Sequence, residues 1–550
     1  MARCHPSRPS PSATVPGQRS LRWLLGLVLL LNGGCQASDR APLPTVMPPP
    51  LPSGSGAVVA SEPAALHWFV PPPPAVQAGN PVLWVALASR LGPRDGASSP
   101  EPPAAPLRLR AASGELSLVD GTGQRFVAPA FALHWRWLPL PQPFTVRRRV
   151  LGPFASYESA EAAARRWAAA GAQPRIARPA EWEVWAAPDS PAPSDLSTRL
   201  VERRESRRLV LELRRPEGAV VLEGPIRIEA PAGLLWQDGR YGGPFRLQSD
   251  AHGGWTLLEE LPLERYLEGV VPHEIGAGSP PAALAAQAVL ARTWAVKNLI
   301  RYGVDGYHLC ADTQCQVYSD PGQASASVRA AIVATRGQVL TAAGGPIQAV
   351  YHASNGGVAA GLEEAWDVEP VPYLRPFVDA PPAAALRWPL PLAAKALPLL
   401  LRGDGGAYGA DHPRFRWQRQ LTAGRLAEAM AARGTAVGAV GSIRVLERGA
   451  SGRVVELEIG GSAGRVVLRR DAIRRTLREL PSTLFTLTPA GEGVWRLEGG
   501  GFGHGAGLSQ AGAIDLARRG WSSDRILQHY YPGTALQPLE AIGSALQGGG

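Results

Sequence analysis

The stretch LEGVVPHEIGAGSPPAALAAQAVLARTWAVKN, residues 267–298, contains the signals that decide the local fold. Pro280 follows a Gly/Ser turn and suits the first turn of a helix, and Ser279 before it is a typical N-cap residue. These residues predict a helix over 280–301. Small residues recur along it at helical spacing, which predicts one narrow stripe that packs closely against another element. The stripe consists of Leu284, Ala288, Ala291, Ala295 and Leu299, with Gln287, Arg292 and Asn298 outside it.

One carboxylate, Glu274, lies between the Val-Val-Pro-His run and this predicted helix. Breaking a glycosidic bond requires a group that is still partly protonated near neutral pH and can donate a proton to the leaving oxygen. Apolar surroundings raise the pKa of a glutamate from about 4.3 toward about 6. Glu274 is therefore a candidate catalytic acid. The alternative is an exposed glutamate at the end of a strand, which is the commoner use of this residue type.

Size and charge restrict the possible functions only loosely. The chain has 550 residues, enough for several domains of about 100–200 residues each. Its formal net charge of +10 would suit an anionic partner, but the arginines are scattered along the chain. Because no basic run is interleaved with aromatic residues, we expect no binding of nucleic acid.

The N-terminus has the pattern of an export signal. Two arginines precede the apolar run Trp23–Leu31, which is too short to cross a hydrocarbon core of about 30 Å as a helix. The run ends in NGGC, which resembles a lipobox with Cys35 as the lipidated residue, although Asn32 stands where leucine is usual. Residues 1–35 are thus predicted to be a signal peptide, either lipid-anchored at Cys35 or plainly cleaved. We expect the protein in the periplasm or cell envelope.

Composition and hydrophobic pattern divide the rest of the chain. Proline-rich segments such as VMPPPLPSGSG predict a disordered spacer. Strand patterns then predominate with a few helices between them, so we predict an α+β fold. Strands are expected to continue through 254–271, further helices are expected over 324–335 and 421–434, and 442–461 is expected to form a hairpin. The predicted parts are a spacer at 36–80, strands at 81–140, a β-α-β insertion at 141–190, a main domain at 205–536 with an insertion at 381–415, and a flexible tail at 537–550.

The insertion at 141–190 contains VLGPFASYESAEAAARRWAAAG, in which a helix begins near Ser156 and ends at Gly171. This pattern resembles one half of a SPOR repeat. Members of that family bind peptidoglycan glycan strands from which the peptides have been removed. The alternative is an ordinary β-α-β insertion.

Four separated segments of the main domain resemble the SpoIID/LytB family, in the same order. They are LPLERYLEGVVPHEI with AALAAQAVLARTWAVKN, then CADTQCQVYSD, then YHASNGGVAAGLEEAWDVEPVPYLRPFVD, and finally GGGFGHGAGLSQAGA. The resemblance covers 207–380 and 415–536, and the strands at 81–130 fit the N-terminal part of the family. It implies a β-rich domain with a few helices around a glycan-binding cleft.

The resemblance implies that the protein acts on peptidoglycan, because sporulation members of the family are lytic transglycosylases that cut glycan strands lacking stem peptides. Glu274 matches the catalytic glutamate of the family. In this reaction the 6-hydroxyl of MurNAc attacks its own anomeric carbon, so one glutamate acts as acid and then as base. A second carboxylate nucleophile is not needed.

Other residues receive roles from the same resemblance. Arg292 would hold the substrate or orient Glu274, and Asp379 would stabilise the oxocarbenium-like transition state or hold Arg292. For each residue the alternative is a purely structural role. The predicted substrate-binding residues, on two glycine-containing turns, are His352, Ser354, His504, Ser509 and Gln510.

Cys310 and Cys315 form a close pair in HLCADTQCQVY. Outside the cytoplasm such a pair forms a disulfide or supplies metal ligands. Some family members hold zinc around this segment with a histidine just before the second cysteine, but Gln314 occupies that position here. His308 would be a third ligand, whereas structural zinc usually has four protein ligands. A disulfide, a structural zinc site and free thiols all remain open, and the chemistry itself requires no cofactor.

We therefore predict an exported lytic transglycosylase that cleaves the β-1,4 bond between MurNAc and GlcNAc in peptide-free glycan and forms 1,6-anhydro-MurNAc. Its expected partners are glycan strands, the membrane through a lipid anchor, and a cell-wall amidase. The competing hypothesis is a non-catalytic glycan-binding or amidase-enhancing protein that uses the same cleft.

Overall fold

A computed structural model describes residues 64–93, 105–192 and 196–546 of the chain. The predicted signal peptide, Cys35 and most of the predicted spacer lie outside these residues. Among the described residues, no helix has the length and apolar character needed to cross a membrane. The structure mixes strands and helices, which confirms the predicted α+β class.

Two large sheets pack face to face. Residues Leu83, Leu118 and Leu247 of one sheet share a buried core with Leu109 and Leu211 of the other, as in a β-sandwich. The first sheet has the order β16 (Leu309–Cys310), β2 (Val82–Leu91), β15 (Trp255–Pro262), β14 (Phe245–Ser249), β11 (Ile226–Glu229), β4 (Leu116–Val119) and β5 (Arg125–Ala128). The second has the order β10 (Gly218–Leu222), β9 (Thr198–Arg215), β6 (Ala130–Phe154), β3 (Leu107–Ala111), β12 (Leu234–Trp236) and β13 (Gly239–Tyr241).

The packed region extends beyond the predicted limits at both ends. β1 (Ala64–Ala65) pairs with β6, and Val70 and Val76 are buried, so the residues from 64 to 80 do not form a disordered spacer. At the other end, β29 (Ala535–Pro538) pairs with β17 (Gln338–Ala342). Buried apolar side chains hold both segments on the core, an effect that the high proline content of the first segment obscured.

Residues Leu263–Val271 form helix α2, whereas the sequence pattern predicted that the strand would continue to Val271. Strand β15 ends at Pro262, and the apolar residues after it recur at helical spacing. Leu263, Leu267 and Val270 are fully buried, and this periodicity matches one face of a helix. A short π-helix, Pro272–Gly276, follows, and α3 (Pro281–Lys297) comes next.

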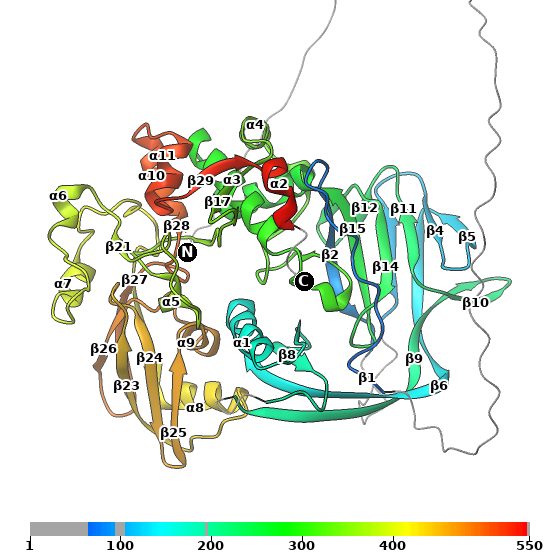
Figure 1. The fold of residues 1–550 in the computed structure, drawn as a ribbon, viewed down its shortest axis with the longest axis horizontal. Coiled ribbons are helices and arrows are strands. Elements are labelled where there is room, and N and C mark those ends of the chain that lie inside the picture. The colour runs from blue at the N-terminus through cyan, green and yellow to red at the C-terminus, as the bar shows by residue number, and fades with distance from the viewer. Residues whose placement is uncertain (1–63, 94–104, 193–195, 547–550) are drawn as a thin grey trace, which may run out of the picture. The chain divides into compact units, whose positions relative to one another are not determined.

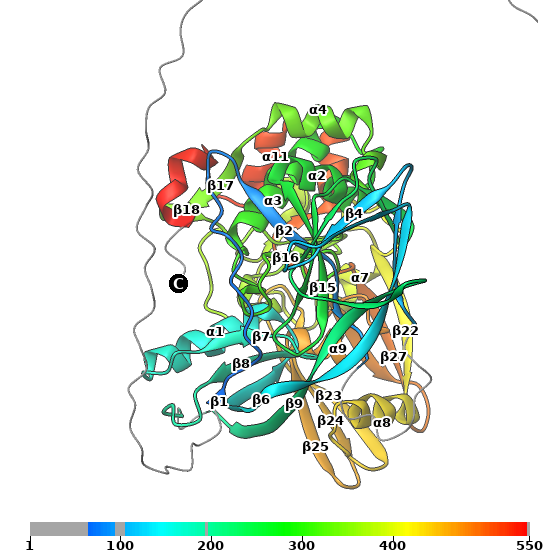
Figure 2. The ribbon, with the colours of Figure 1, turned by 90° about the vertical axis from the view of Figure 1, so that its right-hand side faces the viewer.

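Helix α3 is buried on nearly all sides, so the prediction of one narrow packing stripe is wrong. Gln287 and Arg292, which were expected outside the stripe, have no exposed surface. The helix also ends earlier than predicted, and Pro280 rather than Ser279 occupies the N-cap position. The elements that contact it include α2, β17, α4 (Ala326–Ala334), α10 (Gln510–Arg518) and α11 (Ser523–Tyr530). Figure 2 shows α2, α4, α11 and β17 near it.

The segment 141–190 has the predicted order of strand, helix and strand pair. Helix α1 (Tyr157–Ala169) begins after Ser156, whose side chain accepts a hydrogen bond from the backbone N–H of Ser159. β8 (Trp182–Ala186) pairs with β6 on one side and with β7 (Arg175–Ala177) on the other. The resemblance to a SPOR repeat stays a prediction.

The C-terminal part contains two three-stranded sheets with a predicted helix beside them (Figure 1). β23 (Val440–Arg448) and β24 (Val454–Gly461) form the antiparallel hairpin that the sequence suggests, and β25 (Gly464–Arg469) extends it. The remaining elements are β22 (Arg416–Thr422), β26 (Phe485–Pro489), β27 (Val494–Gly500), α8 (Ala423–Ala432), α9 (Asp471–Thr476), and α6 (Pro382–Ala385) with α7 (Leu397–Arg402) in the predicted insertion.

Candidate active site

A cleft of about 830 Å³ contains Glu274 and is lined by residues that lie far apart in the sequence. One part of its wall comes from the start of α1, another from the region around Glu274, and a third from the C-terminal sheets and α9. The lining includes 155–158, Glu274, Arg301, 313–317, Tyr351, 364–366, Arg414, Arg419, Arg470, Asp471, Arg474, Arg475, 478–481, Phe502 and His504.

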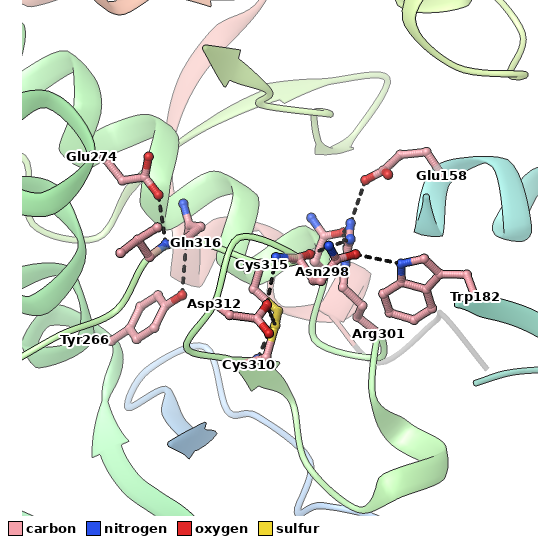
Figure 3. The surroundings of a disulfide bond; sticks show 12 residues. Glu158, Trp182, Tyr266, Glu274, Asn298, Arg301, Cys310, Asp312, Cys315 and Gln316 are labelled. Atoms are coloured by element: carbon pink, nitrogen blue, oxygen red, sulfur yellow. Dashed lines mark hydrogen bonds and ion pairs between the residues drawn. A yellow bond between two sulfur atoms is a disulfide. The ribbon is translucent and has the colours of Figure 1, made fainter. Parts of the chain in front are cut away.

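Glu274 lies in the π-helix between α2 and α3. Single turns of this kind inside helical segments are rare and are frequent at functional sites. The backbone N–H of Val317 donates a hydrogen bond to Oε1 of Glu274 at 2.9 Å (Figure 3). Burial raises the pKa of Glu274, and hydrogen bonding from Val317, Tyr351 and Gln510 opposes this shift without cancelling it. The pKa of Glu274 is thus shifted in the direction that a general acid requires.

A chain of three side chains supports the loop that carries Val317. The hydroxyl of Tyr266 donates to Oε1 of Gln316 at 3.2 Å, and Nε2 of Gln316 donates to the hydroxyl of Tyr351 at 2.9 Å. Tyr266 belongs to α2, whereas Tyr351 lies in β19 (Tyr351–His352). These hydrogen bonds therefore fix the position of residues 316–317 relative to the helix that precedes Glu274.

Cys310 and Cys315 form a disulfide, with their Cα atoms 5.6 Å apart, at the start of this loop. His308 does not fit the role of a third zinc ligand, because both of its ring nitrogens bond to the backbone. The N–H of Trp84 donates to Nδ1 at 2.8 Å, and Nε2 lies 3.0 Å from the carbonyl oxygen of Pro74. No group of three or more metal-binding side chains occurs among the described residues. The donor set therefore fits a disulfide rather than a zinc site.

The loop after the disulfide also contacts the segment 141–190. Nε1 of Trp182 donates to Oε1 of Gln314 at 3.0 Å, and Arg301 donates to the carbonyl oxygen of Gln314 at 3.0 Å. Arg301 forms an ion pair with Glu158 of α1 at 2.6 Å. Figure 3 shows Glu158, Trp182 and Arg301 on the side of the loop that faces away from Glu274.

His504 lines the cleft, and His352 lies behind it. The rings are in an edge-to-face contact with centroids 5.0 Å apart. Nε2 of His504 bonds to the carbonyl oxygen of Tyr351 at 2.8 Å, and Nδ1 of His352 bonds to the carbonyl oxygen of Ala506 at 3.1 Å. Burial lowers the pKa of both histidines, that of His504 to about 3. Both rings are therefore neutral, and His504 contributes shape and an aromatic surface together with Trp366.

The glycine-rich turn that contains His504 requires its glycines for close approach. Gly505 and Gly507 have φ angles of +89° and +72°. A Cβ atom on Gly505 would come within 2.4 Å of the guanidinium of Arg453, and one on Gly507 within 2.0 Å of the carbonyl oxygen of Val350. The glycines of this turn thus allow close packing against the protein itself.

Three predicted binding residues lie beneath the cleft surface. Ser354 is buried and its hydroxyl accepts a hydrogen bond from the N–H of Gly356. Ser509 is the N-cap of α10, where its side chain accepts from the N–H of Gly512. Gln510 lies close to Glu274, because a hydrogen bond from its side chain is one of the interactions that lower the pKa of Glu274.

The structure does not bring Arg292 or Asp379 to the cleft, although both were predicted to act in catalysis. Arg292 forms a two-point ion pair with Glu264, at 2.8 and 2.7 Å. Asp379 is fully buried and accepts hydrogen bonds from Asn355 and Tyr530, at 2.7 and 2.9 Å. Neither side chain is among the residues that line the cleft. These contacts indicate that Arg292 and Asp379 stabilise the surrounding helices.

Comparison with known proteins finds matches for two regions of the chain. Residues 251–341 match the model for the Stage II sporulation protein family (SpoIID), and residues 360–507 match a domain of unknown function (DUF8618). Stage II sporulation protein D of Bacillus subtilis (strain 168) is 27% identical over 302 residues, covering 52% of this chain and 77% of the relative. The amidase enhancer of the same organism is 28% identical over 298 residues, covering 49% of this chain and 40% of the relative.

These matches support the SpoIID/LytB family for this chain. The SpoIID match contains Glu274, the disulfide and Val317, whereas the DUF8618 match contains Trp366 and His504. The cleft is therefore built by both matched regions together with the start of α1. The Brachyspira hyodysenteriae (strain ATCC 49526 / WA1) protein BHWA1_00569 is also similar, with 28% identity over 285 residues.

Sequence reasoning did not find several residues of the site. Val317 acts through its backbone N–H, for which a sequence has no signal. Tyr351 directly precedes His352 in one of the quoted segments, so the segment was found but not the residue. The arginines of the cleft wall were considered scattered, because only folding brings them together.

Proposed function

We propose that this protein is a lytic transglycosylase that cleaves the MurNAc–GlcNAc β-1,4 bond of peptide-free peptidoglycan glycan, with Glu274 as acid and then base. The observation that carries the proposal is the position of Glu274, which lies in the wall of a large cleft with its pKa raised by burial and one oxygen held by the N–H of Val317. Membership of the SpoIID/LytB family supports a role at the cell wall.

The surroundings of Glu274 favour a reaction with one carboxylate. The groups that affect its pKa are its buried setting, Val317, Tyr351 and Gln510, and none of these is a carboxylate. Hydrolysis by two carboxylates would require a second one about 5–10 Å from the first. The other acidic residues on the cleft wall all have partners. Glu158 is ion-paired with Arg301, Glu364 is bonded to Ser451, Asp471 accepts a hydrogen bond from Ser159, and Glu479 is ion-paired with Arg425.

The proposed reaction proceeds in two proton transfers. Protonated Glu274 donates its proton to the glycosidic oxygen while the bond from that oxygen to the anomeric carbon of MurNAc breaks. The resulting carboxylate then accepts the proton of the 6-hydroxyl of the same MurNAc as that oxygen bonds to the anomeric carbon. The products are a 1,6-anhydro end and a free hydroxyl end, and Glu274 is protonated again.

The predicted export signal and the predicted lipid anchor at Cys35 fit an enzyme that meets its substrate in the cell envelope. An amidase would act before it, because removal of stem peptides produces the peptide-free strand. The similarity to a protein named amidase enhancer supports association with such an enzyme as part of the proposal.

The test compares wild type with Glu274→Gln on purified peptide-free glycan, with products analysed by mass spectrometry. We expect 1,6-anhydro ends from wild type and at least about a hundredfold fewer from the variant, because the proton donor is lost. Glu217→Gln, an exposed change in the turn between β9 and β10, is the control and should match wild type. If wild type forms no 1,6-anhydro ends while still binding the strand, the non-catalytic hypothesis replaces this one.

A further inference from the structure

The wall of the cleft formed by α9 and the adjacent strands carries an excess of positive charge. Arg414, Arg419, Arg474 and Arg478 line it, and none of them forms an ion pair with a carboxylate of the described residues. The cleft carboxylates already have partners. Glu158 pairs with Arg301, Glu364 with Ser451, Asp471 with Ser159, and Glu479 with Arg425.

Arg474 is the unusual member of this group. Its Nε atom is buried without a hydrogen-bond partner in the described part of the chain, and burial lowers the pKa of its guanidinium. A buried charged group normally has a counterion or a full set of hydrogen bonds, because removing it from water is costly. The Nε atom of Arg474 is therefore available to donate a hydrogen bond to a bound anion.

The surroundings of Arg474 add to the charge imbalance. It interacts electrostatically with His504, on the cleft wall, and with the fully buried Arg453. Arg453 uses its terminal nitrogens on the carbonyl oxygens of Val358 and Asn355, and Glu364 is the acidic residue that acts on it. Glu364 therefore acts on Arg453 and not on Arg474, and an incoming anion would supply the counterion of Arg474.

We propose that Arg474, assisted by Arg414, Arg419 and Arg478, forms a subsite for the free lactyl carboxylate of MurNAc. This inference rests on the proposed glycan substrate. Arginine is suited to carboxylates because its planar donors match the two oxygens. In a peptide-bearing strand the lactyl carboxyl group is consumed in the amide bond to the stem peptide, so the charge is present only after the peptide has been removed. The subsite therefore selects strands that an amidase has already processed.

Binding is measured in the full-length Glu274→Gln protein, so that the strand is not cut and the result does not depend on catalysis. The probes are amidase-treated glycan strands, the same strands with their carboxylates converted to methylamides, and peptide-bearing strands. Adding Arg474→Gln should weaken binding of the amidase-treated strands about tenfold and leave the methylamide strands unaffected. Arg474→Lys should recover part of the loss, and Arg125→Gln, which alters an exposed residue of β5 outside the cleft, should change nothing.

Because Arg474 has no hydrogen-bond or ion-pair partner in the part of the chain that the structure describes, Arg474→Gln should not lower the melting temperature. Arg478→Gln, at an exposed position of the same wall, provides an independent variant with an expected loss of about threefold for the amidase-treated strands. Unchanged binding in both variants would overturn the proposal. An equal loss for the methylamide strands would overturn it in favour of packing, and an equal arginine-dependent affinity for peptide-bearing strands would assign the subsite to peptide carboxylates instead. Absence of 1,6-anhydro products from wild type would leave the binding result intact and contradict only the catalytic proposal.

Discussion

Glu274 depends on neighbours that reach it from distant parts of the chain. Val317 lies 43 residues away and supplies a backbone N–H, and Tyr351 and Gln510 come from still later segments. Burial disfavours the ionised carboxylate, whereas these hydrogen bonds favour it. Because burial is the largest of these effects, the pKa lies above its ordinary value.

The raised pKa predicts a particular dependence of activity on pH. The proton donor is present below the folded-state pKa of Glu274 and is lost as the pH rises through it, so the alkaline limb of the rate profile should lie above the ordinary glutamate range. Tyr351→Phe removes a hydroxyl that lowers this pKa and should move the limb to higher pH. Tyr373→Phe, which removes a hydroxyl bonded to the N–H of Gln348, is the control. A limb that stays in place or moves to lower pH in Tyr351→Phe would contradict this account.

At the scale of elements, α2, the π-helix and α3 form one unit that presents Glu274. Arg292 links the parts of this unit. Its guanidinium, on α3, pairs with Glu264 of α2 and also donates a hydrogen bond to the carbonyl oxygen of Gln338 in β17 at 3.1 Å. Arg292 is fully buried. The arrangement makes it a residue that positions the helices and does not touch the cleft.

We expect Arg292→Met to reduce the free energy of unfolding by about 3 kcal/mol, because it leaves Glu264 without its partner. Denaturant unfolding measures this loss. Arg265→Met is the control, since its exposed pair with Glu268 contributes less than about 1 kcal/mol. The alkaline limb of the pH profile should be the same in the folded variant as in wild type. A fall in activity with unchanged stability would instead assign Arg292 to catalysis.

At the scale of the whole molecule, the site requires segments from both ends of the main domain. Helices α10 and α11 pack on α3, and Leu516, Ile526 and Tyr530 belong to the same buried core as the two large sheets. The region matched by the SpoIID family model ends at residue 341 and therefore lacks these helices.

A protein that ends after Gly507 should consequently fail to fold, because α3 would lose α10 and α11 and expose much of its apolar surface. Calorimetry should show no cooperative transition for it. A matched protein that ends after residue 546 should unfold at the same temperature as the full chain. Cooperative unfolding of the shorter protein near the wild-type temperature would show that the core is independent of its C-terminal helices.

Local signals in the sequence were enough to determine several elements. Ser156 and Gly171 mark the ends of α1 because capping and left-handed backbone conformations are properties of a few neighbouring residues. The β23–β24 hairpin and the family motif around Glu274 were found for the same reason. Helix α2 was missed because a short apolar run after a strand is compatible with a strand or a helix until the elements that pack against it are known.

By itself, then, the sequence determined the α+β class, the resemblance to the SpoIID/LytB family and Glu274 as the candidate acid, because these depend on local pattern and on motifs. Only the tertiary structure decided that Arg292 and Asp379 are buried away from the cleft, that Cys310 and Cys315 are bonded, and that separated arginines meet on one wall. The physical reason is that burial, pairing and electrostatic surroundings are set by contacts between residues far apart in the chain. Those contacts do not exist until the chain has folded.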